Sequence, residues 1–108
     1  MSQNLKDFLQ ECCLLIDMGR VDPFTKNPDT KATLNMLKYN PSAMLQEIKE
    51  LKSSHLYKSA EPDDNSRYPG EVWQFKKLVK GHLIYIKLKI KDINGYKKLF
   101  VMSFHPDR

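Results

Sequence analysis

The stretch GHLIYIKLKIKD, from Gly81 to Asp92, alternates apolar and polar residues one by one, as a β-strand with one buried face does. One side of this strand carries four aliphatic residues: Ile84, Ile86, Leu88 and Ile90. The other side carries one aromatic and three basic residues: Tyr85, Lys87, Lys89 and Lys91. The aliphatic side needs a hydrophobic core to cover it, so the chain is expected to build a sheet that packs on other elements. The basic side needs a separate explanation.

Two turn signals border this strand and extend the prediction to a meander. Lys80-Gly81 precedes it and Asn94-Gly95 follows it, and Asn-Gly is the strongest short hairpin signal. The flanking segments EVWQFKKLV (71–79) and KKLFVMSFH (97–105) are rich in aromatic and β-branched residues. The C-terminal half is therefore predicted to form three antiparallel strands.

The N-terminal half has helical periodicity instead. Within residues 5–19 the apolar positions recur at helical spacing, and Gly19 is a suitable C′ residue. These positions are Leu5, Phe8, Leu9, Cys12, Cys13 and Ile16. Two further helices are expected to begin at Asp29 and Pro41. Their apolar stripes are Leu34, Met36 and Leu37 in the first and Met44, Leu45, Ile48 and Leu51 in the second.

Two connecting segments complete the outline. RVDPFTK (20–26) is expected to be a short edge strand, because a proline is tolerated at a sheet edge and not inside. SSHLYKSAEPDDNSRYPGE (53–71) has the composition of an exposed loop. Helices followed by antiparallel strands predict an α+β fold, in which N-terminal helices pack on a C-terminal antiparallel β-sheet.

Length and charge limit the possible functions. The 108 residues favour a single domain, 1–108, and their balance of 41% hydrophobic and 29% charged residues is that of a folded protein. The net charge of +5 suits a phosphate-bearing or acidic partner. The longest apolar run, CCLLI (12–16), is far shorter than the ~20 residues that cross a bilayer. The chain is therefore expected to be cytoplasmic, without a membrane partner.

The sequence offers no pattern for a metal site or a disulfide. Cys12 and Cys13 are neighbours on a predicted helix and point about 100° apart, so they are poorly placed to pair and are expected to be small core residues. The three histidines, His55, His82 and His105, lack the spacing of zinc ligands. We therefore expect no metal and no cofactor.

The basic side of the strand has two interpretations. Its lysines either solvate a sheet surface and discourage edge pairing, or form a platform for a phosphodiester backbone with Tyr85 stacking on a base or touching the reacting group. Other residues bear on this choice, and each has an ordinary structural explanation. Lys58 fits a solvated loop, Gln74 an exposed strand position, and His105 an exposed position near the C-terminus. Trp73 is more typical of a core.

An ordered set of short segments resembles a known family. LYKS (56–59), VWQ (72–74), LV with a following glycine (78–81), YIKLKI (85–90) and SFH (103–105) occur in this order. The order is similar to that of the MqsR-type (motility quorum-sensing regulator) toxins of bacterial type II toxin–antitoxin systems. The resemblance is strongest from Leu51 to His105. It implies a RelE-like α+β fold, metal-independent cleavage of mRNA, and a cognate DNA-binding antitoxin that neutralises the toxin by direct contact.

The resemblance also implies roles for individual residues. The family's functional positions fall on Lys58, Gln74, Tyr85 and His105, and the last of these is a lysine in the best-known version. The loop from Lys58 to Gln74 is longer than in that version, and the spacing from Trp73 to Tyr85 is shorter. We expect Lys58, Gln74, Tyr85 and His105 to be catalytic. RNA contacts are expected from Tyr57, Lys87 and Lys89.

Cleavage of RNA without a metal requires protein groups in three chemical roles. One group takes the 2′-hydroxyl proton, another stabilises the phosphorane, and a third protonates the leaving 5′-oxygen. An imidazole, with an ordinary pKa of about 6.5, suits proton transfer in either direction, so His105 and Tyr85 both remain candidates for the acid. Two other classes of function stay open: a non-catalytic RNA-binding module, and a protein-interaction domain whose lysines meet an acidic partner.

Overall fold

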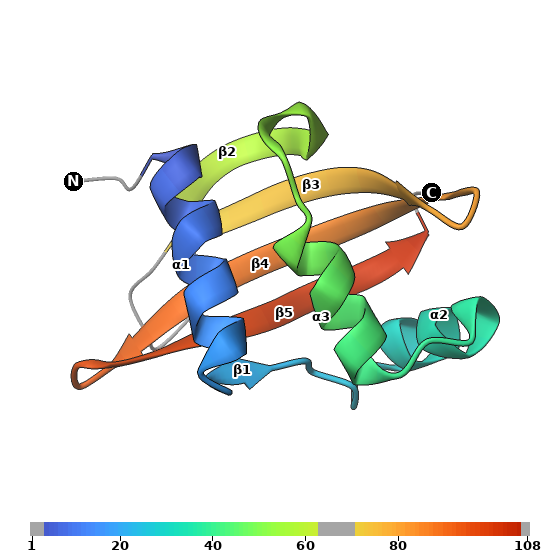
Figure 1. The fold of residues 1–108 in the computed structure, drawn as a ribbon, viewed down its shortest axis with the longest axis horizontal. Coiled ribbons are helices and arrows are strands. Elements are labelled where there is room, and N and C mark those ends of the chain that lie inside the picture. Colours follow the sequence, from blue (N-terminus) through green and yellow to red (C-terminus); the bar gives the residue numbers. More distant parts are fainter. Residues whose placement is uncertain (1–3, 63–70, 107–108) are drawn as a thin grey trace.

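The computed structural model describes residues 4–62 and 71–106, so the exposed loop predicted around residues 63–66 lies outside the described residues. The helices lie in the N-terminal half and all strands except the short β1 lie in the C-terminal half, which confirms the predicted α+β class (Figure 1). The elements in chain order are α1 (Leu5–Asp17), β1 (Val21–Asp22), α2 (Pro28–Leu37), α3 (Pro41–Lys49), the 3₁₀ turn η1 (Ser53–His55), β2 (Leu56–Pro62), β3 (Glu71–Val79), β4 (His82–Ile93) and β5 (Tyr96–Pro106).

The strands form one sheet in the order β1-β5-β4-β3-β2. Strands β2 to β5 pair antiparallel, whereas the short edge strand β1 runs parallel to β5, with Val21 opposite Leu99. The predicted C-terminal antiparallel sheet is therefore confirmed, and the expected edge strand adds one parallel pair to it, so the complete sheet is mixed. The loop prediction is wrong for residues 56–62, because pairing with β3 makes this polar segment the opposite edge strand.

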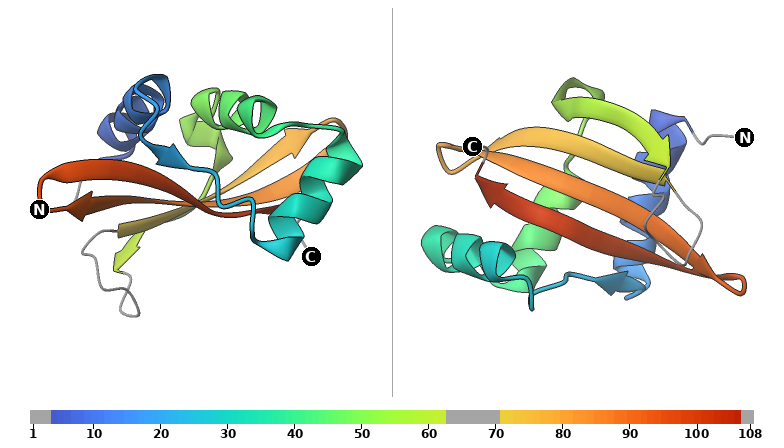
Figure 2. Two further views of the ribbon diagram at one scale, coloured as in Figure 1. Left: turned by 90° about the horizontal axis from the view of Figure 1, so that it is seen from below. Right: turned by 180° about the vertical axis from the view of Figure 1, so that it is seen from behind.

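The helices are distributed unevenly around the sheet. Helices α1 and α3 lie across one face, and α2 lies beside β5 at the edge of the sheet (Figure 2). Seen from behind, strands β3, β4 and β5 lie in front of α1 and α3 (Figure 2, right). We call the side of the sheet that points away from α1 and α3 the outer face. None of the described helices has the length and hydropathy that crossing a bilayer requires.

Local sequence signals account for the boundaries of these elements. Asn4, Asn27 and Asn40 cap the three helices, and each asparagine side chain accepts a hydrogen bond from a backbone N–H of the first turn. Prolines occupy the first positions of α2 and α3. The predicted start of α3 at Pro41 is confirmed, and α2 begins at Pro28, one residue before the predicted Asp29. Both predicted hairpin turns are present, and both residues of Lys80-Gly81 and of Asn94-Gly95 have positive φ.

The hydrophobic core lies between the sheet and the helices. The sheet contributes Trp73, Phe75, Val79, Ile84, Ile86, Leu88, Leu99, Val101 and Phe104. The Trp73 ring stacks on Phe8 of α1 at a centroid distance of 4.8 Å, which confirms the prediction of a core tryptophan. Cys12 is buried and Cys13 half-buried, and both are free thiols. Met36 is 45% exposed, so its place in the predicted apolar stripe of α2 is wrong.

Of the two adjacent lysines in β3, Lys76 and Lys77, the second points toward the helices and anchors α3. The Lys77 ammonium donates to the Glu47 carboxylate at 2.8 Å and to the Glu47 carbonyl at 3.0 Å. The Tyr39 hydroxyl donates to the same carboxylate at 2.6 Å. Burial favours the neutral form of Glu47. The hydrogen bonds that Lys77 and Tyr39 donate to its carboxylate outweigh this effect and hold the pKa of Glu47 below its ordinary value. Alternation then directs the neighbouring Lys76 to the outer face.

Two bulges change which side chains reach the outer face. The register of β2 shifts between Leu56 and Lys58, so Tyr57 and Lys58 both lie on the outer side while Leu56 packs against the core. The register of β5 shifts opposite Lys87 and Leu88. There Val101 and Phe104 both point into the core, and the two residues between them, Met102 and Ser103, point outward. Each bulge therefore adds one side chain to the outer face.

Candidate functional site on the outer face

Cross-strand pairing brings separate segments of the sequence into two rows on the outer face. Lys58 lies opposite Gln74, Gln74 opposite Lys87, and Lys87 opposite Ser103. The neighbouring row joins Lys76, Tyr85 and His105 in the same way. With Tyr57, these residues form a group that we call the outer-face cluster: Tyr57, Lys58, Gln74, Lys76, Tyr85, Lys87, Ser103 and His105. Six of the seven residues predicted for the site thus lie together.

Tyr85 is at the centre of the cluster. Its hydroxyl donates to the Gln74 side-chain oxygen at 2.6 Å. Its ring lies 5.2 Å from the His105 ring between centroids, with the planes tilted by 46°. A phenol ring and an imidazole ring, each of which carries a group able to transfer a proton, therefore lie beside each other on adjacent strands. Gln74 orients the hydroxyl from the other side.

The ring of His105 is held in a defined orientation. Its Nδ1 atom lies 3.0 Å from the backbone carbonyl oxygen of Pro106. A carbonyl oxygen only accepts, so this hydrogen bond requires a proton on Nδ1 and leaves the lone pair of a neutral ring on Nε2. The half-buried ring can therefore accept a proton at Nε2 without losing its backbone contact. This is the arrangement that a general base requires.

The lysines of the cluster place positive charge near Tyr85 and His105. The Lys76 ammonium lies 3.9 Å from the centroid of the Tyr57 ring, and the Lys58 ammonium lies 5.9 Å from it. The aromatic ring thus holds two cations near one another. Lys58 is exposed and Lys87 is half-exposed, so both can contact a dissolved anion. The cluster is suited to a ligand with several negative charges.

Lys89 is a correction to the predicted site. Alternation directs it to the outer face, but its side chain is fully buried, so it cannot contact an RNA in solvent. Its cross-strand neighbours are apolar: Val72 on β3 and Phe100 on β5. Burial depends on what lies around a side chain, and alternation predicts only its direction. We therefore leave Lys89 out of the proposed RNA contacts.

The sequence interpretation missed two members of the cluster. Lys76 lies two residues after Gln74 and opposite Tyr85, so strand alternation applied to EVWQFKKLV would have placed it. Ser103 reaches the outer face only through the bulge in β5. No local sequence signal marks that bulge, so Ser103 could not have been placed from the sequence.

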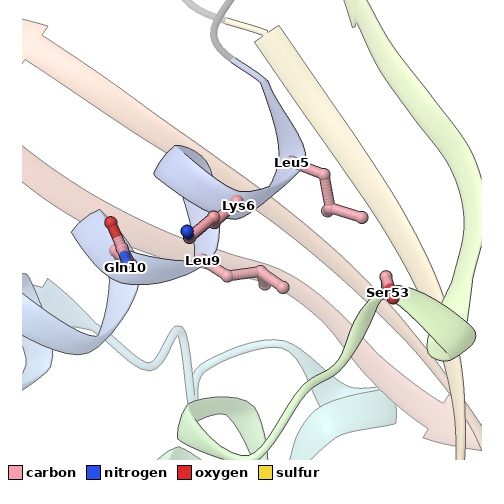
Figure 3. A pocket seen from close by; sticks show the side chains of 5 residues that line it. All are labelled: Leu5, Lys6, Leu9, Gln10 and Ser53. Carbon is pink, nitrogen blue, oxygen red and sulfur yellow. The ribbon is translucent and has the colours of Figure 1, made fainter.

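Other features of the described chain do not compete as reaction centres. Among residues 4–62 and 71–106, no group of three His, Cys, Asp or Glu side chains is placed to hold a metal ion. A hollow of about 520 Å³ lies on the helical side, between α1 and η1 (Figure 3). It is lined by Leu5, Lys6, Leu9, Gln10 and Ser53. With one titratable side chain, Lys6, it offers no acid–base pair.

The comparison with known proteins gave one result. The sequence profile of the family described as motility quorum-sensing regulator, toxin of MqsA, matches residues 8–106, which include every member of the outer-face cluster. Neither the curated proteins nor the solved structures showed significant similarity to the chain.

Proposed function

Because this chain belongs to the family of motility quorum-sensing regulators, the toxins of MqsA, and is thus a toxin of a toxin–antitoxin system, we propose that it is a metal-independent endoribonuclease that cleaves single-stranded mRNA. The main support is the proximity of Lys58, Gln74, Tyr85 and His105 on one sheet face. Such an enzyme would inhibit translation and growth in the cytoplasm until its antitoxin neutralises it. The family implies an antitoxin partner, and we propose that this partner also binds DNA.

The geometry suggests a distribution of roles. The lone pair on Nε2 of His105 takes the proton of the 2′-hydroxyl, whose oxygen attacks the adjacent phosphorus. The bond from phosphorus to the 5′-oxygen breaks, and the Tyr85 hydroxyl turns its proton from Gln74 to that oxygen and donates it. Lys58 and Lys87 hold the non-bridging oxygens, whose negative charge grows in the transition state. The products are a 2′,3′-cyclic phosphate and a 5′-hydroxyl end.

Two further residues, Gln74 and Tyr57, support this reaction without transferring a proton. Gln74 accepts the hydrogen bond of Tyr85 and keeps the hydroxyl on the outer face, while its amide nitrogen remains able to donate to a base edge or to the scissile phosphate. Tyr57 offers an exposed ring for base stacking next to Lys76. The proposed catalytic residues are therefore Lys58, Gln74, Tyr85 and His105, and the proposed RNA contacts are Tyr57, Lys76 and Lys87.

We expect purified protein to cut a defined single-stranded RNA in excess EDTA, because the proposed proton transfers and charge stabilisation all come from side chains. The measurement is gel mapping of the cut sites together with analysis of both new ends. Cleavage that stops in EDTA and returns with Mg²⁺ would contradict the mechanism. RNA binding without cleavage would favour a non-catalytic RNA-binding module, and neither binding nor cleavage would favour a protein-interaction domain.

The lysines of the cluster should control the salt dependence of RNA binding. Lys76→Gln and Lys87→Gln are each expected to reduce the slope of log K against log salt by about 0.7, the value for one phosphate contact on a single strand. The measurement uses a non-cleavable, 2′-deoxy-substituted RNA across a salt series. Lys31→Gln, an exposed change on α2, is the matched control. Unchanged slopes in both cluster variants would mean that these lysines only solvate the sheet.

A further inference from the structure

A small pocket on the outer face lies outside the outer-face cluster. It encloses about 150 Å³ and is lined by Phe24, Lys91, Phe100 and Met102. Two of its four side chains are aromatic rings and one is a cation. We call it the Phe24–Phe100 pocket. None of its residues has a role in the proposed cleavage reaction.

Strand β5 and the loop after β1 place apolar side chains in this pocket. Leu99 and Val101 point into the core, so alternation along β5 directs both Phe100 and Met102 outward. The loop after β1 supplies Phe24. Its backbone N–H donates to the Asp22 carboxylate at 2.8 Å, and its φ is +53°, a value that few residues other than glycine and asparagine adopt readily.

Phe24 is therefore presented to solvent at some conformational cost. Its side chain is 44% exposed, although a large apolar ring gains free energy from burial. A ring held in this way beside a second half-buried ring offers a surface for a flat ligand. Bases of single-stranded RNA stack on such aromatic side chains.

The charges around the pocket suit a ligand that carries phosphate. The Lys91 ammonium lies 4.0 Å from the centroid of the Phe100 ring, and the Lys98 ammonium lies 5.8 Å from it. These two lysines face each other across β4 and β5. Two cations beside one aromatic ring match a nucleotide, whose base is apolar on its faces and whose phosphate is negative.

The pocket is also continuous with the outer-face cluster. Tyr85 pairs with His105, and four residues further along β4 Lys89 pairs with Phe100. At the rise of a strand this separation is about 13 Å. A single RNA strand that lies over Tyr85 and His105 and follows β4 and β5 would reach the pocket within a few nucleotides.

We propose that the Phe24–Phe100 pocket binds one base of the RNA substrate, a few nucleotides away from the cleaved bond, with Lys91 and Lys98 beside its phosphate. This inference rests on the proposed ribonuclease function and adds a recognition subsite to it. The subsite makes cleavage depend on a nucleotide that takes no part in the reaction. Stacking on an aromatic side chain then contributes on the order of 10-fold to kcat/KM.

The test combines protein variants with a series of RNAs that each lack one base. For the wild-type protein, removal of one particular base at a distance from the cut should lower kcat/KM on the order of 10-fold. Phe24→Asn removes the ring, and asparagine tolerates the positive φ. This variant should cleave intact RNA about 10-fold more slowly than the wild type and should be insensitive to loss of that base.

A second variant and a control complete the experiment. Phe100→Leu keeps an apolar side chain against the sheet but removes the flat ring, so it should show the same loss of sensitivity. Leu14→Gln changes an exposed apolar residue of α1 and should behave like the wild type.

The outcomes separate the subsite from the proposed function. If the wild type cleaves RNA but no missing base has an effect that depends on Phe24 or Phe100, the subsite is wrong and the ribonuclease stands. If the wild type cleaves none of the RNAs, both proposals are overturned. If Phe24→Asn weakens only binding of the antitoxin, the pocket belongs to that protein and the base-binding inference is overturned.

Discussion

His105→Ala is expected to lower the rate of RNA cleavage by on the order of 10²- to 10⁴-fold, the contribution typical of a positioned proton-transfer group. The physical reason is the hydrogen bond from Nδ1 to the Pro106 carbonyl, which leaves the lone pair of the neutral ring on Nε2, in a ring that lies beside the Tyr85 ring. Alanine removes both nitrogens and provides no substitute. The measurement is single-turnover cleavage of a defined RNA over a range of pH, since a general base must be unprotonated to act.

The control for this prediction is another histidine of the same sheet. His82 is exposed at the turn between β3 and β4, so His82→Ala removes an imidazole without touching the outer-face cluster. It should cleave at the wild-type rate. The half-buried position of His105 makes a check of folding by circular dichroism necessary. A folded His105→Ala protein with wild-type activity would show that proton transfer does not pass through this residue.

Lys58→Ala is expected to lower the rate on the order of 10²- to 10³-fold, the usual cost of losing one donor to a developing oxyanion. Lys58 is exposed and lies opposite Gln74, so its removal leaves the core intact. Because the charge on the phosphorane oxygens is greatest in the transition state, kcat and kcat/KM should fall together. The same variant, expressed at the wild-type level, should no longer inhibit growth.

The matched control is Lys31→Ala, which removes an exposed lysine of α2 and the same formal charge. It distinguishes a local contact with the scissile phosphate from a general loss of positive charge. If the control and Lys58→Ala reduce the rate equally, the effect is one of net charge. If Lys58→Ala raises KM alone, Lys58 binds the substrate in its ground state and is not part of the catalytic group.

A histidine at position 105 suits the role of a general base better than a lysine would. A lysine at this position would need a lowered pKa before it could act as a base near neutral pH, whereas an imidazole needs no such shift. The Pro106 contact that orients the ring uses only Nδ1, which a lysine side chain lacks. We therefore propose that the histidine replaces the lysine of the family's best-known version and is oriented by its own contact with Pro106.

Local signals were sufficient for much of the fold. Alternation in residues 81–92 and the Asn94-Gly95 turn predicted the sheet and its hairpin. Helical periodicity, with one start at Pro41, predicted the helices. These features depend on residues close in sequence. The same signals failed for β2. Residues 56–62 look like a loop because their strand conformation comes from pairing with β3, and the pairing partner is remote in sequence.

For the site, the sequence by itself determined the direction in which Tyr85, Lys87 and Lys89 point, since alternation along a strand follows from backbone geometry alone. Only the tertiary structure decided which of these residues meet others and which are covered. Register across four strands placed Lys58, Gln74, Tyr85 and His105 together, and a bulge added Ser103. Burial then excluded Lys89. Register and burial depend on contacts between segments far apart in the chain, and no local pattern contains that information.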